Sequence, residues 1–147
     1  MGDISGRAVS FLLGGEMFAV DIENIIEIKN RGGEKLLPGL PDCITGVINH
    51  KGDVIPVMDL RRRMGKPPAE SDGNELDKTC LMIIQNDEDI LALRIDEAVT
   101  SLEYDSESNF MQLDDESVLR GFINRPDGSR ISLFNVGKLI DLDVKIV

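Results

Sequence analysis

The feature that most constrains the fold is a strand–turn–strand unit that occurs twice. Its first copy, residues 46–64, reads GVINHKGDVIPVMDLRRRM, and its second, residues 121–140, reads GFINRPDGSRISLFNVGKLI. Both copies place apolar and β-branched residues on either side of a glycine-containing turn, which is typical of a half-buried β-hairpin. Each copy then offers a helix N-cap, Asp59 in the first and Asn135 in the second. The sequence therefore predicts two hairpins, each followed by a short helix.

The repeat extends upstream of these hairpins at a nearly constant spacing. FAVDIE at residues 18–23 matches LALRID at residues 91–96, and an apolar strand precedes each block, at residues 9–13 and 80–84. A repeat of this length indicates two β subdomains rather than a solenoid, whose units are shorter and more numerous. We expect one domain over residues 1–147. Its repeats lie at about 7–65 and 78–140, joined by a Pro/Ser/Gly-containing linker at 66–77.

Charge and length limit the possible partners and locations. The chain has 147 residues, enough to bury a core, and a formal net charge of −11. Such acidity argues against nucleic acids and anionic membrane surfaces, which attract clustered Lys and Arg. No apolar run approaches the roughly 20 residues of a membrane span, and no leader is recognisable, so we expect a cytoplasmic protein without membrane insertion. Cys43 and Cys80 are expected to be free, buried thiols of a reducing compartment.

Motifs that would indicate catalysis or a cofactor are missing from the sequence. His50 is the only histidine, so a histidine-based metal cluster is not possible. The sequence has no C-x-x-C, no G-x-S-x-G, no Walker A motif and no dinucleotide fingerprint. Its carboxylates are scattered along polar segments, as on an acidic surface. We therefore predict a protein that is not an enzyme, with no catalytic residues, no metal and no cofactor.

Three isoleucines follow the second strand at intervals of three residues. Ile22, Ile25 and Ile28 would lie along one face of a short helix or an extended corner. The bland interpretation is that all three belong to the core. They provide more aliphatic surface than one corner of a small subdomain needs, so we expect part of the stripe to receive a partner helix.

Taken together, these residues resemble the CheW family. The resemblance is carried by FAVDI at 18–22, by Ile25 and Glu27, by Pro38 and Pro41, and above all by residues 46–60, GVINHKGDVIPVMDL. It covers nearly the whole chain and is most specific in the first half, where Gly-Val-Ile-Asn, the turn glycine and the Ile-Pro-Val-x-Asp-Leu block fall at the family's spacing.

The resemblance implies a mainly β fold of two SH3-like, five-stranded barrel subdomains with short helices. It implies an adaptor that couples the signalling tips of methyl-accepting chemotaxis receptors to the regulatory domain of a CheA-type histidine kinase, in chemotaxis or a related pathway. Receptor binding in the family uses an apolar groove between the subdomains, with a charged pair, here Glu27 and Lys51, at its rim. The positions carried over as the groove lining are Val9, Ile22, Ile25, Ile28 and Val99.

Two residues depart from the family pattern. Lys51 stands where an Arg is usual, and His50 stands where an aliphatic residue is usual. A lysine lacks the planar fork with which Arg binds carboxylates through two hydrogen bonds. Two other functions stay open: a CheW-like module of a kinase or receiver-domain fusion, and a barrel that binds a small ligand. Against the latter, the inward positions are almost purely aliphatic, as in small barrels filled by side chains.

Overall fold

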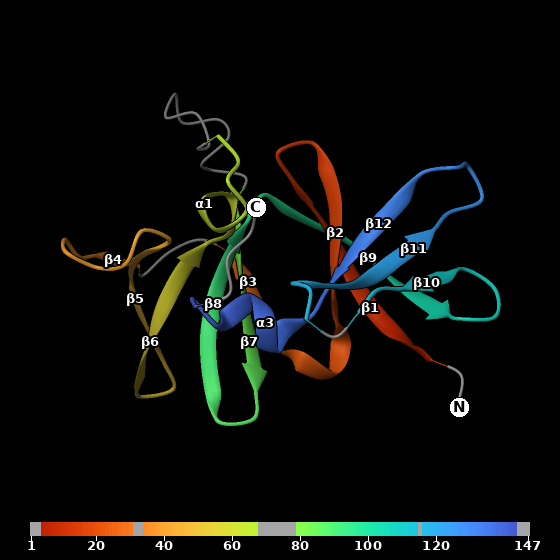
Figure 1. Ribbon diagram of the computed structural model, residues 1–147. Coiled ribbons are helices and arrows are strands. Elements are labelled where there is room, and N and C mark those ends of the chain that lie inside the picture. Colours follow the sequence, from red (N-terminus) through yellow and green to blue (C-terminus); the bar gives the residue numbers. More distant parts are fainter. Residues whose placement is uncertain (1–3, 31–33, 68–78, 115, 144–147) are drawn as a thin grey trace. The chain divides into compact units, whose positions relative to one another are not determined.

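The computed structural model describes residues 4–30, 34–67, 79–114 and 116–143, and these form two sheets of six strands with short helices (Figure 1). The first sheet has the strand order β10-β11-β12-β2-β1-β9. Its strands are β1 (Ser5–Leu13), β2 (Glu16–Asp21), β9 (Glu97–Asp105), β10 (Phe110–Gln112), β11 (Leu119–Asn124) and β12 (Arg130–Phe134). This sheet belongs to a compact unit of residues 1–24 and 98–147, which we call the terminal unit.

The second sheet has the order β3-β7-β8-β6-β5-β4 and belongs to residues 25–97, the central unit. Its strands are β3 (Ile25–Asn30), β4 (Lys35–Leu36), β5 (Ile44–His50), β6 (Asp53–Asp59), β7 (Cys80–Asn86) and β8 (Asp89–Ile95). The predicted mainly β fold in two subdomains is therefore confirmed. Each sheet has one strand more than the resemblance implied, because the very short β4 and β10 pair at an edge.

The two units do not coincide with the two sequence repeats. When the two sheets are aligned by the sequence repeat, β1–β2 correspond to β7–β8, and β9–β12 correspond to β3–β6. Each sheet therefore combines a hairpin from one half of the chain with four strands from the other half, and the hairpin lies between two of those strands. The repeats at 7–65 and 78–140 therefore differ in their bounds from the two units, since sequence similarity identifies equivalent strands but not which copy they pair with. Apart from Lys66 and Pro67, the predicted linker lies outside the described residues.

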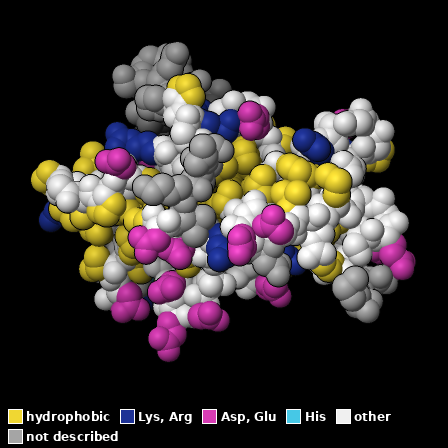
Figure 2. Space-filling model, viewed as in Figure 1, with side chains coloured by type: hydrophobic (Ala, Val, Ile, Leu, Met, Phe, Trp, Pro, Cys, Tyr) yellow, Lys and Arg dark blue, Asp and Glu magenta, His cyan; other side chains and the backbone are white. Residues whose placement is uncertain are grey.

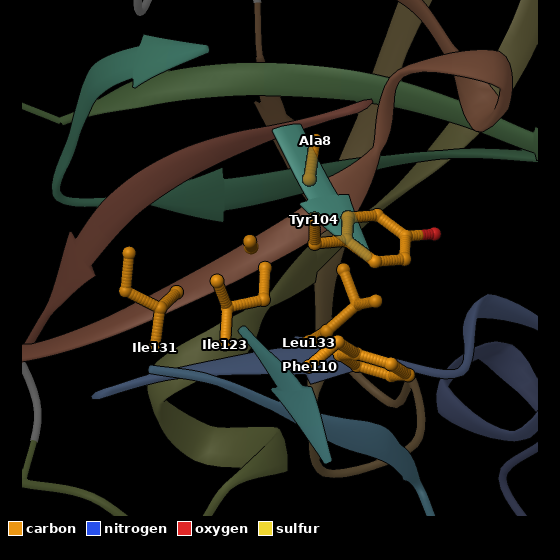
Figure 3. Packing of buried hydrophobic residues seen from close by; sticks show 7 residues of the cluster. Ala8, Tyr104, Phe110, Ile123, Ile131 and Leu133 are labelled. Carbon is orange, nitrogen blue, oxygen red and sulfur yellow. The ribbon is translucent and has the colours of Figure 1, made fainter. Parts of the chain in front are cut away.

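Apolar residues that alternate along the strands fill each sheet's interior. In the terminal unit Figure 3 shows Tyr104 and Phe110 beside aliphatic side chains. The centroids of these two rings lie 5.0 Å apart. That buried cluster comprises Ala8, Ala19, Tyr104, Phe110, Ile123, Ile131 and Leu133. The cluster of the central unit comprises Ile48, Ile55, Val57, Leu81, Ile83 and Ala92. The strand predicted from the apolar run at 80–84 is confirmed as part of β7.

The predicted caps and turns form as expected. The side chain of Asp59 accepts a hydrogen bond from the backbone N–H of Arg61 at the start of α1 (Leu60–Arg63), and Asn135 accepts one from Lys138 at the start of α3 (Val136–Ile140). The β5–β6 turn places Gly52 at φ 90°, a conformation that suits glycine. Both cysteines are free thiols, with Cys43 buried and Cys80 half-buried.

A glycine at the same repeat position bends one strand of each sheet. The pairing of β5 with β6 shifts register between Ile44 and Gly46, and that of β11 with β12 shifts between Leu119 and Gly121. At each of these bulges the neighbouring short strand comes very close to the glycine. A β-carbon on Gly46 would lie 2.2 Å from a backbone oxygen of β4, and one on Gly121 equally close to one of β10. The glycines therefore admit the sixth strand of each sheet.

Within the described part of the chain, the helices are too short to cross a membrane.

Candidate functional site

The predicted isoleucine stripe begins in a turn and ends in a strand. Ile22 opens the 3-10 helix η1 (Ile22–Asn24), whereas Ile25 and Ile28 lie on β3. Ile22 is 44% exposed and Ile28 is 38% exposed, while Ile25 is half-buried. Full burial of a large aliphatic side chain contributes roughly 1.5–3 kcal/mol, and Ile22 and Ile28 forgo part of it. The stripe is therefore not simply core, although its three residues face solvent to different degrees.

The other two groove positions lie on strands of the terminal unit. Val9 is half-buried on β1. Val99 belongs to β9, and its side chain lies outside the described residues. Ile22 also belongs to the terminal unit, whereas Ile25 and Ile28 belong to the central unit. A single groove lined by all five residues stays a prediction.

Glu27, the acidic residue of the predicted rim pair, contacts His50 and not its expected partner Lys51. Oε2 of Glu27 lies 3.6 Å from Nδ1 of His50, whose side chain is only 12% exposed. Lys51 occupies the exposed turn after β5 with φ 52°, and it forms no ion pair with any residue that the structure describes. His50, which departs from the family pattern, is thus the residue that the Glu27 carboxylate contacts. A joint role of Glu27 and Lys51 stays a prediction.

This contact also shows how strongly the central sheet curls. Glu27 lies on β3, the edge strand at one end of the sheet, and His50 lies on β5, next to the other end. A side-chain contact between them requires the sheet to turn back on itself. The local fold therefore brings the β5–β6 turn beside the isoleucines of β3.

Asp21, the residue directly before Ile22, belongs to a buried polar cluster in the terminal unit. The Tyr104 hydroxyl donates a short hydrogen bond to the Asp21 carboxylate, and Nη1 of Arg120 lies 2.5 Å from the other oxygen of that carboxylate. Arg120 also donates to the Tyr104 oxygen at 3.2 Å. Together the three side chains tie β2, β9 and β11 to one point, directly before Ile22. They fix the backbone from which η1 starts.

Gly6 makes room for this cluster. A β-carbon at that position would lie 2.7 Å from the Tyr104 hydroxyl oxygen. A small cavity of about 120 Å³ lies beside the cluster and is lined by Gly6, Tyr104, Arg120 and the start of η1. The cluster was not predicted from the sequence. The available signal was a charged residue at the end of an apolar strand block, FAVDIE, where a buried partner is needed.

We expect Tyr104 to resist ionisation in the folded protein. Burial, followed by its hydrogen bond to Asp21, raises the pKa of Tyr104 above the ordinary value. The unfolded chain releases this proton near pH 10 and the folded chain does not, so the free energy of unfolding should fall as pH rises above about 10. Tyr104 is the only tyrosine, so absorbance at 295 nm reports it directly. Folded protein that titrates like the urea-unfolded chain would contradict this result.

The central unit carries a second buried ionic cluster. Arg94 on β8 pairs with Glu34 through a short contact, and its Nη1 lies 3.9 Å from an oxygen of Asp59. The side chains of Arg94 and Glu34 are 14% and 8% exposed. Beside them lies a cavity of about 450 Å³, whose lining includes leucines and a proline of residues 36–41.

Charged and apolar side chains segregate on the surface of the central unit. In Figure 2 hydrophobic side chains gather over β4, β5 and β6, whereas acidic ones gather near the tip of the β7–β8 hairpin. Leu36 on β4 is 71% exposed and Val54 on β6 is 67% exposed. Among the described residues, no group of three or more His, Cys, Asp or Glu is arranged to hold a metal ion.

The sequence matches one family model over nearly its whole length. The description of that model is "CheW-like domain", and it matches residues 7–144. The chain is 26% identical to the chemotaxis protein CheW of Helicobacter pylori over 138 residues, which cover 92% of this chain and 81% of the relative. It is 39% identical to protein FrzA of Myxococcus xanthus over 59 residues, which cover 40% of this chain and 37% of the relative.

The fold also matches a solved structure along its whole length. The crystal structure of the scaffolding protein TtCheW from Thermoanaerobacter tengcongensis superposes with a TM-score of 0.80 at 20% sequence identity, and the match covers 98% of both chains.

Proposed function

Because this chain belongs to the CheW-like domain family, we propose that it is a scaffolding adaptor of a chemotaxis pathway and acts without catalysis in the cytoplasm. One surface receives the signalling tip of a chemoreceptor, and another receives the regulatory domain of a CheA-type histidine kinase. The observation that carries this proposal is the family match over residues 7–144. Similarity to chemotaxis proteins named CheW in several bacteria supports it.

The proposed receptor site is the apolar groove of Val9, Ile22, Ile25, Ile28 and Val99. Receptor signalling tips are helical, and a helix binds a groove by inserting apolar side chains one turn apart. The exposure of Ile22 and Ile28 supports the assignment, because both can lose water on binding without first leaving a core. Glu27 at 46% exposure and the turn lysine Lys51 then supply charge at the rim, which orients the partner more than it adds affinity.

Replacing Ile22 with Asp should reduce receptor-tip affinity at least tenfold with little change in thermal stability. The side chain is nearly half exposed in the free protein, so the charge costs little until a partner covers it. Titration calorimetry against a soluble receptor-tip fragment measures the affinity, and melting followed by circular dichroism measures the stability.

Met111→Asp is the matched control, because Met111 is 46% exposed in the same unit and is not a groove residue. It should leave receptor binding unchanged. Equal loss in both variants would show that apolar exposure alone, and not the groove, governs binding. Ile25→Asp is a harsher variant, because this side chain is half-buried. If it unfolds the protein, Ile25 belongs to the core and not to the groove.

Glu27 and Lys51 should act together in receptor binding. Lys51→Glu should weaken binding while leaving the melting temperature nearly unchanged, because exposed charges contribute only about 0.2–1 kcal/mol to folding. Adding Glu27→Lys should restore part of the binding, since coupled residues give non-additive effects in a double-mutant cycle. His50→Leu is the informative third variant, because it frees Glu27 from its observed contact. Strictly additive affinities across the cycle would mean that Glu27 and Lys51 do not cooperate.

A further inference from the structure

Each unit is completed by a hairpin from the other half of the chain, and the two hairpins are equivalent. The β1–β2 hairpin joins β12 through the parallel pairs Phe18–Ser132 and Ala19–Leu133. The β7–β8 hairpin joins β6 through the matching pairs, Val57–Ala92 and Met58–Leu93. The two hairpins share one alternation of apolar residues, although Phe11 and Phe18 stack on Phe134 of β12, whereas Leu91 and Met58 stand at the repeat positions of Phe18 and Phe134. A second difference between the hairpins, in buried charge, bears on which set of four strands each one joins.

The hairpins differ in the sign of one buried charge. Asp21 in FAVDIE and Arg94 in LALRID occupy the same repeat position, at the inner end of β2 and β8. Their side chains are 6% and 14% exposed. Asp21 binds Tyr104 and Arg120, whereas Arg94 binds Glu34 and Asp59. The two repeats thus place side chains of opposite charge at the same buried position.

The four strands that each hairpin joins also differ in charge, and their charges are opposite to that of the hairpin they bind. Arg120 occupies the bulge of β11, and its repeat equivalent at the bulge of β5 is the uncharged Thr45. Asp59, the register partner of Arg94, is replaced in the terminal unit by Asn135, which follows β12 at the matching place. Among the described residues, Asp21 therefore meets a cation, Arg120, from β9–β12, whereas Arg94 meets two carboxylates, Glu34 and Asp59, the second of which also lies 3.9 Å from Nε of Arg62 in α1.

Assembly of each hairpin with the strands of its own half would bring like charges together. Asp21 would lie beside Asp59 and Glu34, and Arg94 would lie beside Arg120. Like charges within a few ångströms repel strongly when they are buried, and removing the partner of a buried ion is among the most destabilising changes known. The wrong arrangement would contain this fault in both units at once.

We propose that the opposite charges of Asp21 and Arg94 determine which hairpin completes which unit, and so direct the exchange between the two halves of the chain. The apolar faces supply the affinity of each hairpin for a sheet. The ion pairs supply the choice between two nearly equivalent sheets, by opposing the wrong one as well as by stabilising the right one. This is a device for specificity of assembly, and it does not depend on the proposed function.

The test uses the full chain and reads strand neighbours directly. Backbone NOEs in isotope-labelled protein should join β2 to β12 at Phe18 and Ser132, and β8 to β6 at Val57 and Ala92. Asp21→Arg should lower the melting temperature by roughly 10 °C, because it removes the partner of Arg120 and places a second arginine beside it. Glu23→Arg is the matched control, since it makes the same change of charge on an exposed residue two positions away, and it should have little effect.

Two double variants then separate the charges from the rest of the sequence. In Asp21→Arg/Arg94→Asp, only the non-exchanged arrangement pairs opposite charges, so NOEs from β2 to β6 should replace those from β2 to β12. In Asp21→Arg/Arg120→Asp the native pair is restored with reversed sign, so the protein should fold. Both hairpins are then basic and both sites acidic, so a second set of NOEs, from β2 to β6, should appear beside the native set.

The second variant keeps the test decisive if the first fails to fold. Asp21→Arg/Arg120→Asp protein with NOEs from β2 to β12 alone would overturn the proposal. The short connections that follow the hairpins, Ile22–Asn24 after β2 and Asp96 after β8, would then be what sends each hairpin to the other unit.

Discussion

Dividing the chain between residues 67 and 79 should give two fragments, neither of which folds alone, and which regain the β-sheet spectrum when mixed. Fragment 1–67 contains β1–β6, but its hairpin β1–β2 belongs to the same sheet as β9–β12, which lie in the other fragment. Fragment 79–147 has the converse problem. Each fragment therefore holds pieces of two incomplete sheets, and each sheet lacks strands that bury its apolar face.

The expected effect is complete loss of structure in the separate fragments. Far-UV circular dichroism and amide dispersion in NMR spectra measure it, and a titration of one fragment with the other measures the recovery. The control is the intact chain, which should unfold in a single transition by circular dichroism and by Tyr104 fluorescence. A cooperatively folded fragment 1–67 would contradict the exchanged topology.

Gly46→Ala should destabilise the protein by about 3 kcal/mol, and Gly121→Ala by a similar amount. In an ordinary strand this substitution stabilises, because glycine loses more conformational freedom on folding than alanine. At these two bulges the new methyl group would lie 2.2 Å from the Lys35 or Met111 carbonyl oxygen, so the short neighbouring strand has to move. Urea denaturation at constant slope measures the loss.

Gly39→Ala is the control for backbone strain alone. Gly39 has φ +78°, and a β-carbon there meets nothing within 4 Å. Its substitution should cost only the conformational strain of about 1 kcal/mol. If all three variants lose the same stability, close approach of β4 and β10 is not what requires glycine at positions 46 and 121.

Local features of the fold could be predicted from the sequence because nearby residues determine them. The positive φ of Gly52 and the N-caps Asp59 and Asn135 follow from turn and capping chemistry within a few residues. The exchange of hairpins could not be predicted in this way. The two repeats share one apolar pattern, and such a pattern states that a strand needs a partner but not which of two equivalent partners it takes.

The site was predicted at the level of residues but not of their contacts. The spacing of Ile22, Ile25 and Ile28 indicated a shared face, and the exposure of Ile22 and Ile28 agrees with a role beyond the core. The contact of Glu27 with His50 arises from the curl of the sheet between β3 and β5, which no local pattern encodes. The Asp21–Tyr104–Arg120 cluster joins residues far apart in the chain for the same reason.

Scaffolding is the central claim, and it requires two partners to bind the protein at the same time. The most direct test is size-exclusion chromatography with light scattering on the protein mixed with a receptor signalling-tip fragment and the regulatory domain of a CheA-type kinase. We expect a ternary complex that forms only when the protein is present. With the Ile22→Asp variant, the complex should lose the receptor fragment but keep the kinase domain. Absence of binding to either partner, or binding of the two only in competition, would contradict an adaptor function.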